Sequence, residues 1–292
     1  MMIFYSALFN ADAKSGTREP AVSGMFYPGN AEELKQMISD FLAEADQEVS
    51  GEIFGLVAPH AGYVYSGPVA AQAYRQIMNQ SYDTVVVMAP SHFEPFRGIS
   101  IFNGEFYKTP LGKIPLEKSI IEEITRKTAV ARLSPKGHGS NPRGRGEHAL
   151  EVQLPFLQTI LDDFKLVPLI FADQDLETVK IISQSLAEIL KNRNVLLVAS
   201  SDLSHYYTYQ QARSLDRRFL DHFTDLKYEE IIRGCEARRL EACGYGPVAA
   251  LLLTGKLLGF TKSKVIHYAT SGDVPTGEKS QVVGYMAGAV YR

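Results

Sequence analysis

The sequence predicts a single α/β domain of three layers, with helices on both faces of a mixed, largely parallel sheet. Three short runs rich in Val, Leu and Ile, at 53–59, 84–90 and 194–200, each end in Pro or Ser, as is typical of buried parallel strands. Helical segments alternate with these runs, which is the order expected when helices cover both faces of one sheet. No change of composition divides the chain, so we expect an N-terminal arm at 1–17 and one domain at 18–292.

Apolar residues at helical spacing recur between the strands and predict helices. Asn30 is the expected N-cap of the first helix, because its side chain can accept from the free N–H groups there. Pro68 fits the first turn of the second helix. Pro155 predicts a kink or a break in the helical segment 147–163. The first two helices are expected at 31–46 and 68–80, and the others at 116–128, 178–192, 210–226, 228–240 and 246–259.

Further strands follow from the same apolar pattern, at 164–173, 264–270 and 282–291. Asn103 and Gly104 lie between strand-like residues and predict a β-hairpin that turns at these two residues. The basic, glycine-rich segment 136–146 is expected to be a loop.

Composition limits the function classes. The 292 residues are 45% hydrophobic and 22% charged, with a formal net charge of -3, so no global field favours nucleic acid or an anionic membrane. Two cysteines in a chain of this length make no disulfide framework, which favours a reducing cytoplasm. No apolar stretch approaches the roughly 20 residues that span a bilayer. The short apolar run at the start of the sequence, in MMIFYSALFNADAKSG, has no basic segment before it, so no signal peptide is expected.

Imidazole and carboxylate side chains follow the three apolar runs. His60 follows the first run, His92 the second, and Asp202 and His205 the third, where we expect them in a turn or a first helical turn. In open α/β sheets the reactive groups lie just beyond the carboxyl ends of the strands. The sequence therefore predicts one pocket that holds either a metal ion or a set of general acids and bases.

Cys243 and Asp202 are the candidate third ligands beside the two histidines. Two histidines with one anionic ligand suit Fe(II), and three protein ligands with a water are equally typical of catalytic zinc. Cys243 precedes an apolar helix, so we expect its thiol pKa to be lowered. Each residue also has a plainer interpretation, since His60 can be a hydrogen-bonded loop residue, Asp202 a helix cap and Cys243 a small buried hydrophobe.

The segment before the 147–163 helix adds further candidates. His148 could lie over the pocket, or it could cap or pack against the helix. Arg143 and Arg145 could hold an anionic substrate, or they could be part of a solvated loop.

Seven blocks of the chain, in order, resemble the Memo family, which is itself similar to class III extradiol dioxygenases of the LigB type. The resemblance runs from about Arg18 to Tyr291. The blocks are REPAVSGMFYPG, APHAGYVYSGPVAAQAY, APSHFEPFRGISIF, EHALEVQLPFLQ, VASSDLSHY, CGYGPVAALL and GYMAGAVY. The resemblance implies a single LigB-like αβα domain with a mixed central sheet.

The resemblance also implies roles for particular residues. His60, His92 and Cys243 match the metal-site positions, with Asp202 beside them. His205 matches the acid/base of the dioxygenases, and His148 matches another pocket histidine of the family. The chain departs from these relatives at two positions. Cys243 stands where a dioxygenase of this class would use glutamate, and Phe93 stands where animal Memo proteins typically have a second histidine.

Three functions are consistent with these residues. The first is a non-haem iron oxidoreductase that uses Fe(II), with zinc or copper as the other ions that the donor set suits. The second is a metal-dependent hydrolase, in which the ion acidifies a water molecule. The third is a non-catalytic metal-handling or peptide-binding module. The resemblance further implies partners of the radical-SAM and AMMECR types, and the sequence identifies no substrate.

Overall fold

The computed structural model describes residues 16–139 and 146–292. Most of the expected arm, together with Arg143 and Arg145, lies outside the described residues. The central sheet has nine strands, in the order β10-β12-β2-β9-β3-β8-β4-β7, with β11 pairing to β12. These strands are β2 (Ile53–Ala58), β3 (Thr84–Pro90), β4 (Ile99–Ile101), β7 (Ala131–Leu133), β8 (Lys165–Phe171), β9 (Val195–Ser200), β10 (Asp202–Tyr207), β11 (Lys262–Thr270) and β12 (Val282–Tyr291).

The middle of the sheet is parallel. Strands β2, β9, β3 and β8 run in one direction, and every residue of β2, β3 and β9 is buried. Strands β12 and β4 pair antiparallel to this block on its two sides. The predicted mixed sheet is therefore confirmed, and its parallel strands are the three apolar runs together with β8. Because these strands are parallel, their carboxyl ends lie along one edge of the sheet.

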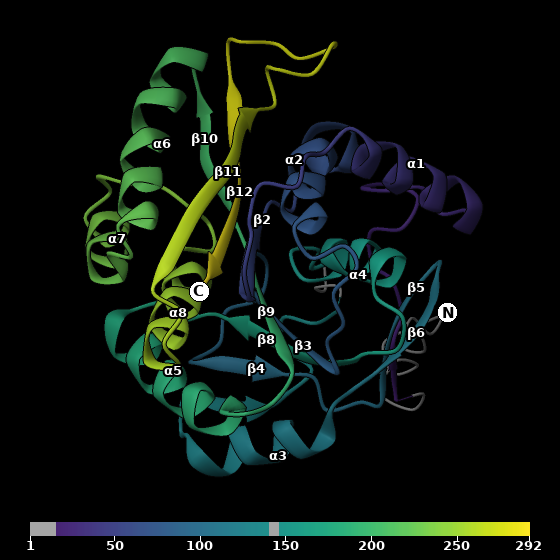
Figure 1. Ribbon diagram of the computed structural model, residues 1–292, viewed down its shortest axis with the longest axis vertical. Helices are drawn as coiled ribbons and strands as arrows, with labels where there is room; N and C mark the ends of the chain where they lie inside the picture. Colours follow the sequence, from purple (N-terminus) through teal and green to yellow (C-terminus); the bar gives the residue numbers. More distant parts are fainter. Residues whose placement is uncertain (1–15, 140–145) are drawn as a thin grey trace, which may run out of the picture.

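Helices cover both faces of the sheet (Figure 1), which confirms the predicted three-layer αβα domain. One face is covered by α1 (Ala31–Ala43), α2 (Tyr63–Arg75) and α4 (Leu154–Ile160). The other is covered by α3 (Lys118–Lys127), α5 (Leu176–Leu190), α6 (Tyr209–Thr224), α7 (Tyr228–Glu236) and α8 (Tyr245–Leu257). The Asn30 side chain caps α1 as expected. In the described part of the chain, no helix has both the length and the apolarity to cross a membrane.

The predicted hairpin at Asn103 and Gly104 is wrong. Strand β4 leaves that region to pair with β8 in the main sheet. The hairpin instead joins β5 (Phe106–Thr109) to β6 (Gly112–Pro115), and β1 (Thr17–Arg18) pairs with β5 to complete a small second sheet. Gly104 is needed for close packing, because a Cβ there would lie 2.2 Å from a ring carbon of Phe102 and 2.6 Å from the Gly16 carbonyl oxygen.

The second helix also starts earlier than predicted, at Tyr63, so Pro68 lies inside α2. A proline in a helix leaves the carbonyl four residues earlier without its bond. That carbonyl belongs to Val64 in the first turn, where the side chain is 61% exposed. Water can reach this end of the helix, which explains why the proline is tolerated.

Two further segments differ from the prediction. Asp202 and His205 lie in strand β10, which pairs antiparallel with β12 and has register shifts on both sides of His205. Sequence spacing alone missed this strand because its ladder partner lies about eighty residues further along the chain. The segment 147–163 begins with an irregular stretch and a turn, followed by a single 3-10 turn, η2 (Glu151–Gln153), and then α4. Pro155 lies in the first turn of α4.

Candidate metal centre

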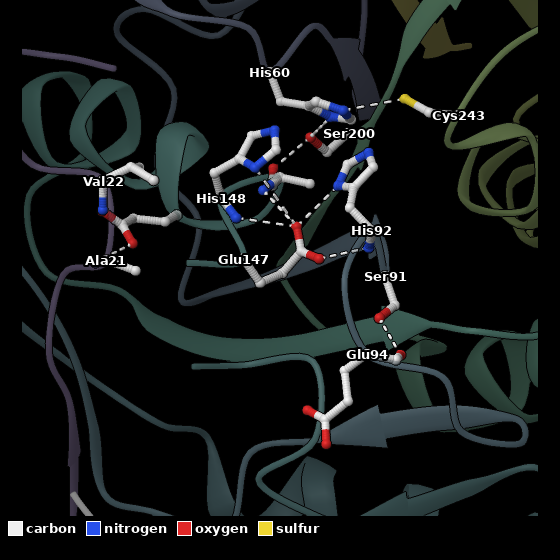
Figure 2. Close-up of polar contacts among 12 residues, drawn as sticks. Ala21, Val22, His60, Ser91, His92, Glu94, Glu147, His148, Ser200 and Cys243 are labelled. Atoms are coloured by element: carbon white, nitrogen blue, oxygen red, sulfur yellow. Dashed lines mark hydrogen bonds and ion pairs between the residues drawn. The ribbon is translucent and has the colours of Figure 1, made fainter. Parts of the chain in front are cut away.

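Three side chains from separate parts of the chain meet at the carboxyl edge of the sheet (Figure 2). His60 follows β2, His92 follows β3, and Cys243 precedes α8. One ligand atom from each lies within 4.8 Å of the others. Cys243 Sγ is 3.1 Å from His60 Nε2, and the two imidazole ring centres are 5.1 Å apart. The structure thus brings together the three residues for which the sequence predicted metal binding.

The backbone around Cys243 is tied to the start of β10. The Cys243 N–H donates to the Asp202 carbonyl (3.1 Å), and the Gly244 N–H donates to the Ser201 hydroxyl (2.9 Å). A Cβ at position 244 would lie 2.2 Å from the Ser200 carbonyl oxygen, so only glycine permits this approach. The glycine after Cys243 therefore brings the thiol down onto the sheet edge.

His60 is buried and held at two points. Its backbone N–H donates to Asp202 Oδ1 (2.7 Å), and its Nδ1 contacts the Ser200 hydroxyl at 2.9 Å. Burial, with the nearby histidines, keeps the pKa of His60 well below 6.5, so the ring is neutral at pH 7. Burial also raises the pKa of Asp202 to about 6. Asp202 is committed to the loop backbone and is not part of the cluster of ligand atoms.

Glu147 supports His92. Its carboxylate accepts from the His92 backbone N–H (2.6 Å) and contacts His92 Nδ1 at 3.0 Å. It also accepts from the backbone N–H groups of His148 (3.0 Å) and Ala149 (3.2 Å). Burial alone would raise the pKa of Glu147, but the bonds from His92 hold it below its ordinary value. Burial likewise would lower the pKa of His92, but contacts with Cys243 and Glu147 raise it to about 10.

A second group of possible ligand atoms, from His92, Glu147 and His148, also lies within 4.8 Å. One Glu147 oxygen already faces three donors and the other faces a backbone N–H. A metal ion would have to displace these bonds, whose loss in a buried place is costly. Glu147 is therefore better suited to orienting His92 than to binding an ion itself.

His148 lies over the two candidate histidine ligands, which was one of the two positions considered for it from the sequence. Its ring stacks on His92 at 4.9 Å between centres, meets His60 edge-on at 5.5 Å and packs against Phe26 at 4.6 Å. Burial and the neighbouring His92 lower the pKa of His148 to about 4. A neutral imidazole thus lies against both candidate histidine ligands.

His205 lies further out, on β10. Its backbone N–H donates to Glu241 Oε1 (2.9 Å), and its Nδ1 lies 3.6 Å from the same oxygen. The His205 side chain is 29% exposed, and it lies outside the cluster of ligand atoms. His205 is therefore placed at the margin of the site and not among the ligands.

The expected lowering of the Cys243 pKa is wrong. Burial raises the pKa of this thiol, and the contact with His92 offsets only part of that rise. A helix N-terminus favours a thiolate only where the charge is otherwise tolerated. Without an ion, Cys243 is therefore an un-ionised, partly buried thiol, and a bound cation would be needed to ionise it.

A buried ion pair fixes the segment that carries Glu147. The Arg18 guanidinium pairs with Glu151 and donates to the carbonyls of Glu147 (2.7 Å) and His138 (2.6 Å). Glu151 also accepts from the Tyr27 hydroxyl at 2.5 Å. Arg18 is 5% exposed and Glu151 0%. The segment that contains Arg18 and Tyr27 is thereby bound to the segment Glu147–Glu151.

Sequence reasoning assigned no role to Glu147, Ser200 or Gln153. Glu147 directly precedes His148, and Ser200 is the last residue of an apolar strand that leads to Asp202. Their position next to His148 and before Asp202 is the only feature of the sequence that points to Glu147 and Ser200. Their hydrogen-bonding roles depend on partners far away in the sequence, which local patterns do not identify. The donor set itself fits a metal ion, since two imidazoles and a thiolate suit Fe(II), Zn(II) and copper alike.

Comparisons with known proteins agree with this picture. The family model for Memo-like proteins matches residues 18–289. A MEMO1 family protein of Nitrosopumilus maritimus is 36% identical over 276 residues, covering 92% of this chain and 98% of the relative. A second, from Methanocaldococcus jannaschii, is 36% identical over 290 residues, covering 94% and 98%. An uncharacterized Escherichia coli K12 protein of known structure shares the fold, with a TM-score of 0.57, 13% identity and coverage of 81% and 99%. The chain belongs to the Memo family.

Proposed function

We propose that His60, His92 and Cys243 bind one metal ion, with iron(II) ahead of zinc and copper, and that the protein is an oxidoreductase. The observation that carries the proposal is the convergence of the three ligand atoms within 4.8 Å of one another. Three well-separated segments deliver them, and each is held by hydrogen bonds of its own. The similarity of Memo proteins to LigB-type dioxygenases, expected from the sequence, supports iron.

The remaining polar groups suit the handling of protons around such an ion. Bound iron(II) would supply one-electron chemistry and open positions for small molecules. His148, neutral and beside both histidine ligands, can accept a proton from a bound substrate. His205 lies at the margin, where it can exchange protons with solvent while Glu241 orients its ring. A thiolate donates more charge than the glutamate of the dioxygenases, which favours a substrate other than a catechol.

Metal content tests the first half of the proposal. Protein purified without air or chelators should contain about one iron per chain by elemental analysis, and Cys243→Ser should lose most of it. Cys235→Ser is the matched control, because Cys235 lies in α7 outside the cluster of ligand atoms. It should bind as much metal as the wild type. Equal metal content in all three proteins would show that the thiol is no ligand.

Oxygen uptake tests the second half. Iron-loaded protein should consume oxygen in the presence of a suitable reductant, and His60→Ala should abolish the consumption. A panel of catechols, thiols and other reductants is needed, since the sequence specifies no substrate. Zinc in the purified protein, with ester or amide hydrolysis lost on chelation, would replace the oxidoreductase with a hydrolase.

A further inference from the structure

The Ser200 hydroxyl is surrounded by three groups that together fix the position of its proton. Its oxygen lies 2.6 Å from the Ala149 carbonyl, 2.7 Å from Gln153 Nε2 and 2.9 Å from His60 Nδ1. A carbonyl oxygen can only accept, so the single hydroxyl proton points to Ala149. The oxygen is then left to accept from both Gln153 and His60.

The orientation of the Gln153 amide is itself determined. Its Oε1 accepts from the Tyr74 hydroxyl (2.8 Å), and its Nε2 donates to the Pro59 carbonyl at 2.9 Å. Turning the amide around would place two carbonyl oxygens against each other at Pro59. The Gln153 nitrogen is therefore the donor to Ser200, and it cannot take the hydroxyl proton.

It follows that His60 Nδ1 carries a hydrogen and donates it to Ser200. A neutral imidazole has one N–H, and the bond made by one nitrogen decides the state of the other. His60 Nε2 is therefore a lone pair, and it is this atom that lies 3.1 Å from Cys243 Sγ. The ring presents a metal donor in the metal-free protein.

His92 is also held at Nδ1, but by a different partner. The ionised Glu147 carboxylate can only accept, so the His92 Nδ1 that lies 3.0 Å away must carry a hydrogen. Figure 2 shows the other ring nitrogen turned toward His60 and Cys243. Both histidines are thus held at Nδ1 and present Nε2 to the same point.

We propose that Ser200 and Glu147 are the positioning residues of the metal centre, and that they hold His60 and His92 with Nδ1 protonated and Nε2 as the donor atom. Gln153 acts behind Ser200 by keeping its hydroxyl proton away from His60. The inference rests on the proposed function in that the ion is the one proposed above. Partners of this kind fix the ring orientation and raise the basicity of the donor nitrogen.

Nuclear magnetic resonance of the metal-free protein tests the protonation pattern directly. Long-range proton–nitrogen spectra should show His60 as a neutral ring with its hydrogen on Nδ1, and His92 with a hydrogen on Nδ1. In Ser200→Ala the His60 pattern should change, because the acceptor is gone. Ser204→Ala is the matched control, since Ser204 is a fully buried serine that contacts Asp216 and neither candidate histidine ligand.

Cobalt(II) titration tests the consequence for binding. Ser200→Ala and Glu147→Gln should each weaken cobalt(II) affinity by about 10- to 100-fold. The thiolate-to-cobalt absorption band should remain at saturation, because Cys243 is still present. Ser204→Ala and Glu241→Gln should bind as the wild type does, the second because its carboxylate contacts His205 and not a ligand. Should Glu147→Gln fail to fold, Ser200→Ala carries the test alone.

The two proposals fail in different ways. Wild-type affinity in both Ser200→Ala and Glu147→Gln, or a His60 hydrogen found on Nε2, would overturn the positioning role while leaving the metal centre intact. A wild-type protein that binds no metal, yet shows the expected His60 pattern, would refute the metal function and not the hydrogen-bond assignment.

Discussion

Gly55 shows at the scale of one residue how closely the strand that carries His60 is packed. A Cβ at this position in β2 would lie 2.3 Å from Leu251 Cδ1 and 2.7 Å from the Leu197 carbonyl oxygen. The leucine side chain can move, but the carbonyl belongs to the neighbouring strand β9 and is fixed by the ladder. Helix α8, which follows Cys243, is thereby seated directly on β2.

Gly55→Ala should therefore lower the free energy of unfolding by about 1–3 kcal/mol, as overpacking of a filled core typically does. Urea unfolding monitored by circular dichroism measures the change. Gly139→Ala is the control, because no atom of residues 16–139 or 146–292 lies within 4 Å of a Cβ there. Its effect should stay within about 0.5 kcal/mol. If Gly55→Ala lowers the free energy of unfolding no more than the control does, β2 and α8 can make room for the added Cβ and are not tightly packed.

The ligands could be read from the sequence because each lies next to a strongly patterned element. His60 and His92 follow strands that are apolar throughout, and parallel strands end at a common edge. Ser200 and Glu147 could not be assigned, because their roles are set by partners more than fifty residues away or on another segment. The cysteine pKa was mispredicted because burial outweighed the helix terminus.

At the scale of elements, the small sheet is joined to the rest of the site through one buried cation. Arg18, in β1, holds the Glu147–Glu151 segment by an ion pair and two carbonyl bonds. Removing one partner of a buried pair leaves the other charge uncompensated, which typically costs 3–5 kcal/mol. The strand β1 therefore contributes to stability through the Arg18 side chain far more than through its short backbone ladder with β5.

Arg18→Met should lower the free energy of unfolding by about 3–5 kcal/mol, since Glu151 would stay buried without its counter-ion. Chemical denaturation measures it. Lys108→Met removes an ion pair to Glu19 at the same small sheet, where both side chains are more than 40% exposed. That control should change stability by no more than about 1 kcal/mol. Similar losses in the two variants would contradict the role of Arg18.

Elements with a long, uniform pattern were predicted well, and those fixed by distant pairing were not. Strands β2, β3, β8 and β9 and the amphipathic helices follow their apolar residues. Strand β10 was missed because it exists only through its ladder with β12. The Asn103–Gly104 turn was mispredicted because β4 finds a better partner in β8 than in its sequence neighbour.

At the scale of the whole molecule, two buried histidines make stability depend on pH. Burial, with the nearby Arg18, lowers the pKa of His138 to about 3, and burial lowers that of His148 to about 4. In the unfolded chain both would have a pKa near 6.5. Between these values the unfolded state binds more protons than the folded state, so stability falls as the pH is lowered below about 6.5.

His138→Gln should flatten this dependence in the metal-free protein. A glutamine can accept from the Tyr107 hydroxyl that contacts His138, and it does not titrate. The slope of unfolding free energy against pH between 4 and 6 should fall by up to about 1.4 kcal/mol per pH unit. This is the slope that corresponds to one proton taken up on unfolding. Urea titrations at several pH values provide the slopes. Parallel profiles for wild type and variant would show that His138 is protonated in the folded state.

The position of β12 affects how the polypeptide matures on the ribosome. This strand is the last described element to be made, yet it pairs with β2, β10 and β11. A nascent chain that stops before residue 282 therefore leaves β2, β10 and β11 each without the partner on the side where β12 would pair, and such open edges promote aggregation. Nascent chains should thus depend on chaperones until Val282–Tyr291 has emerged and paired.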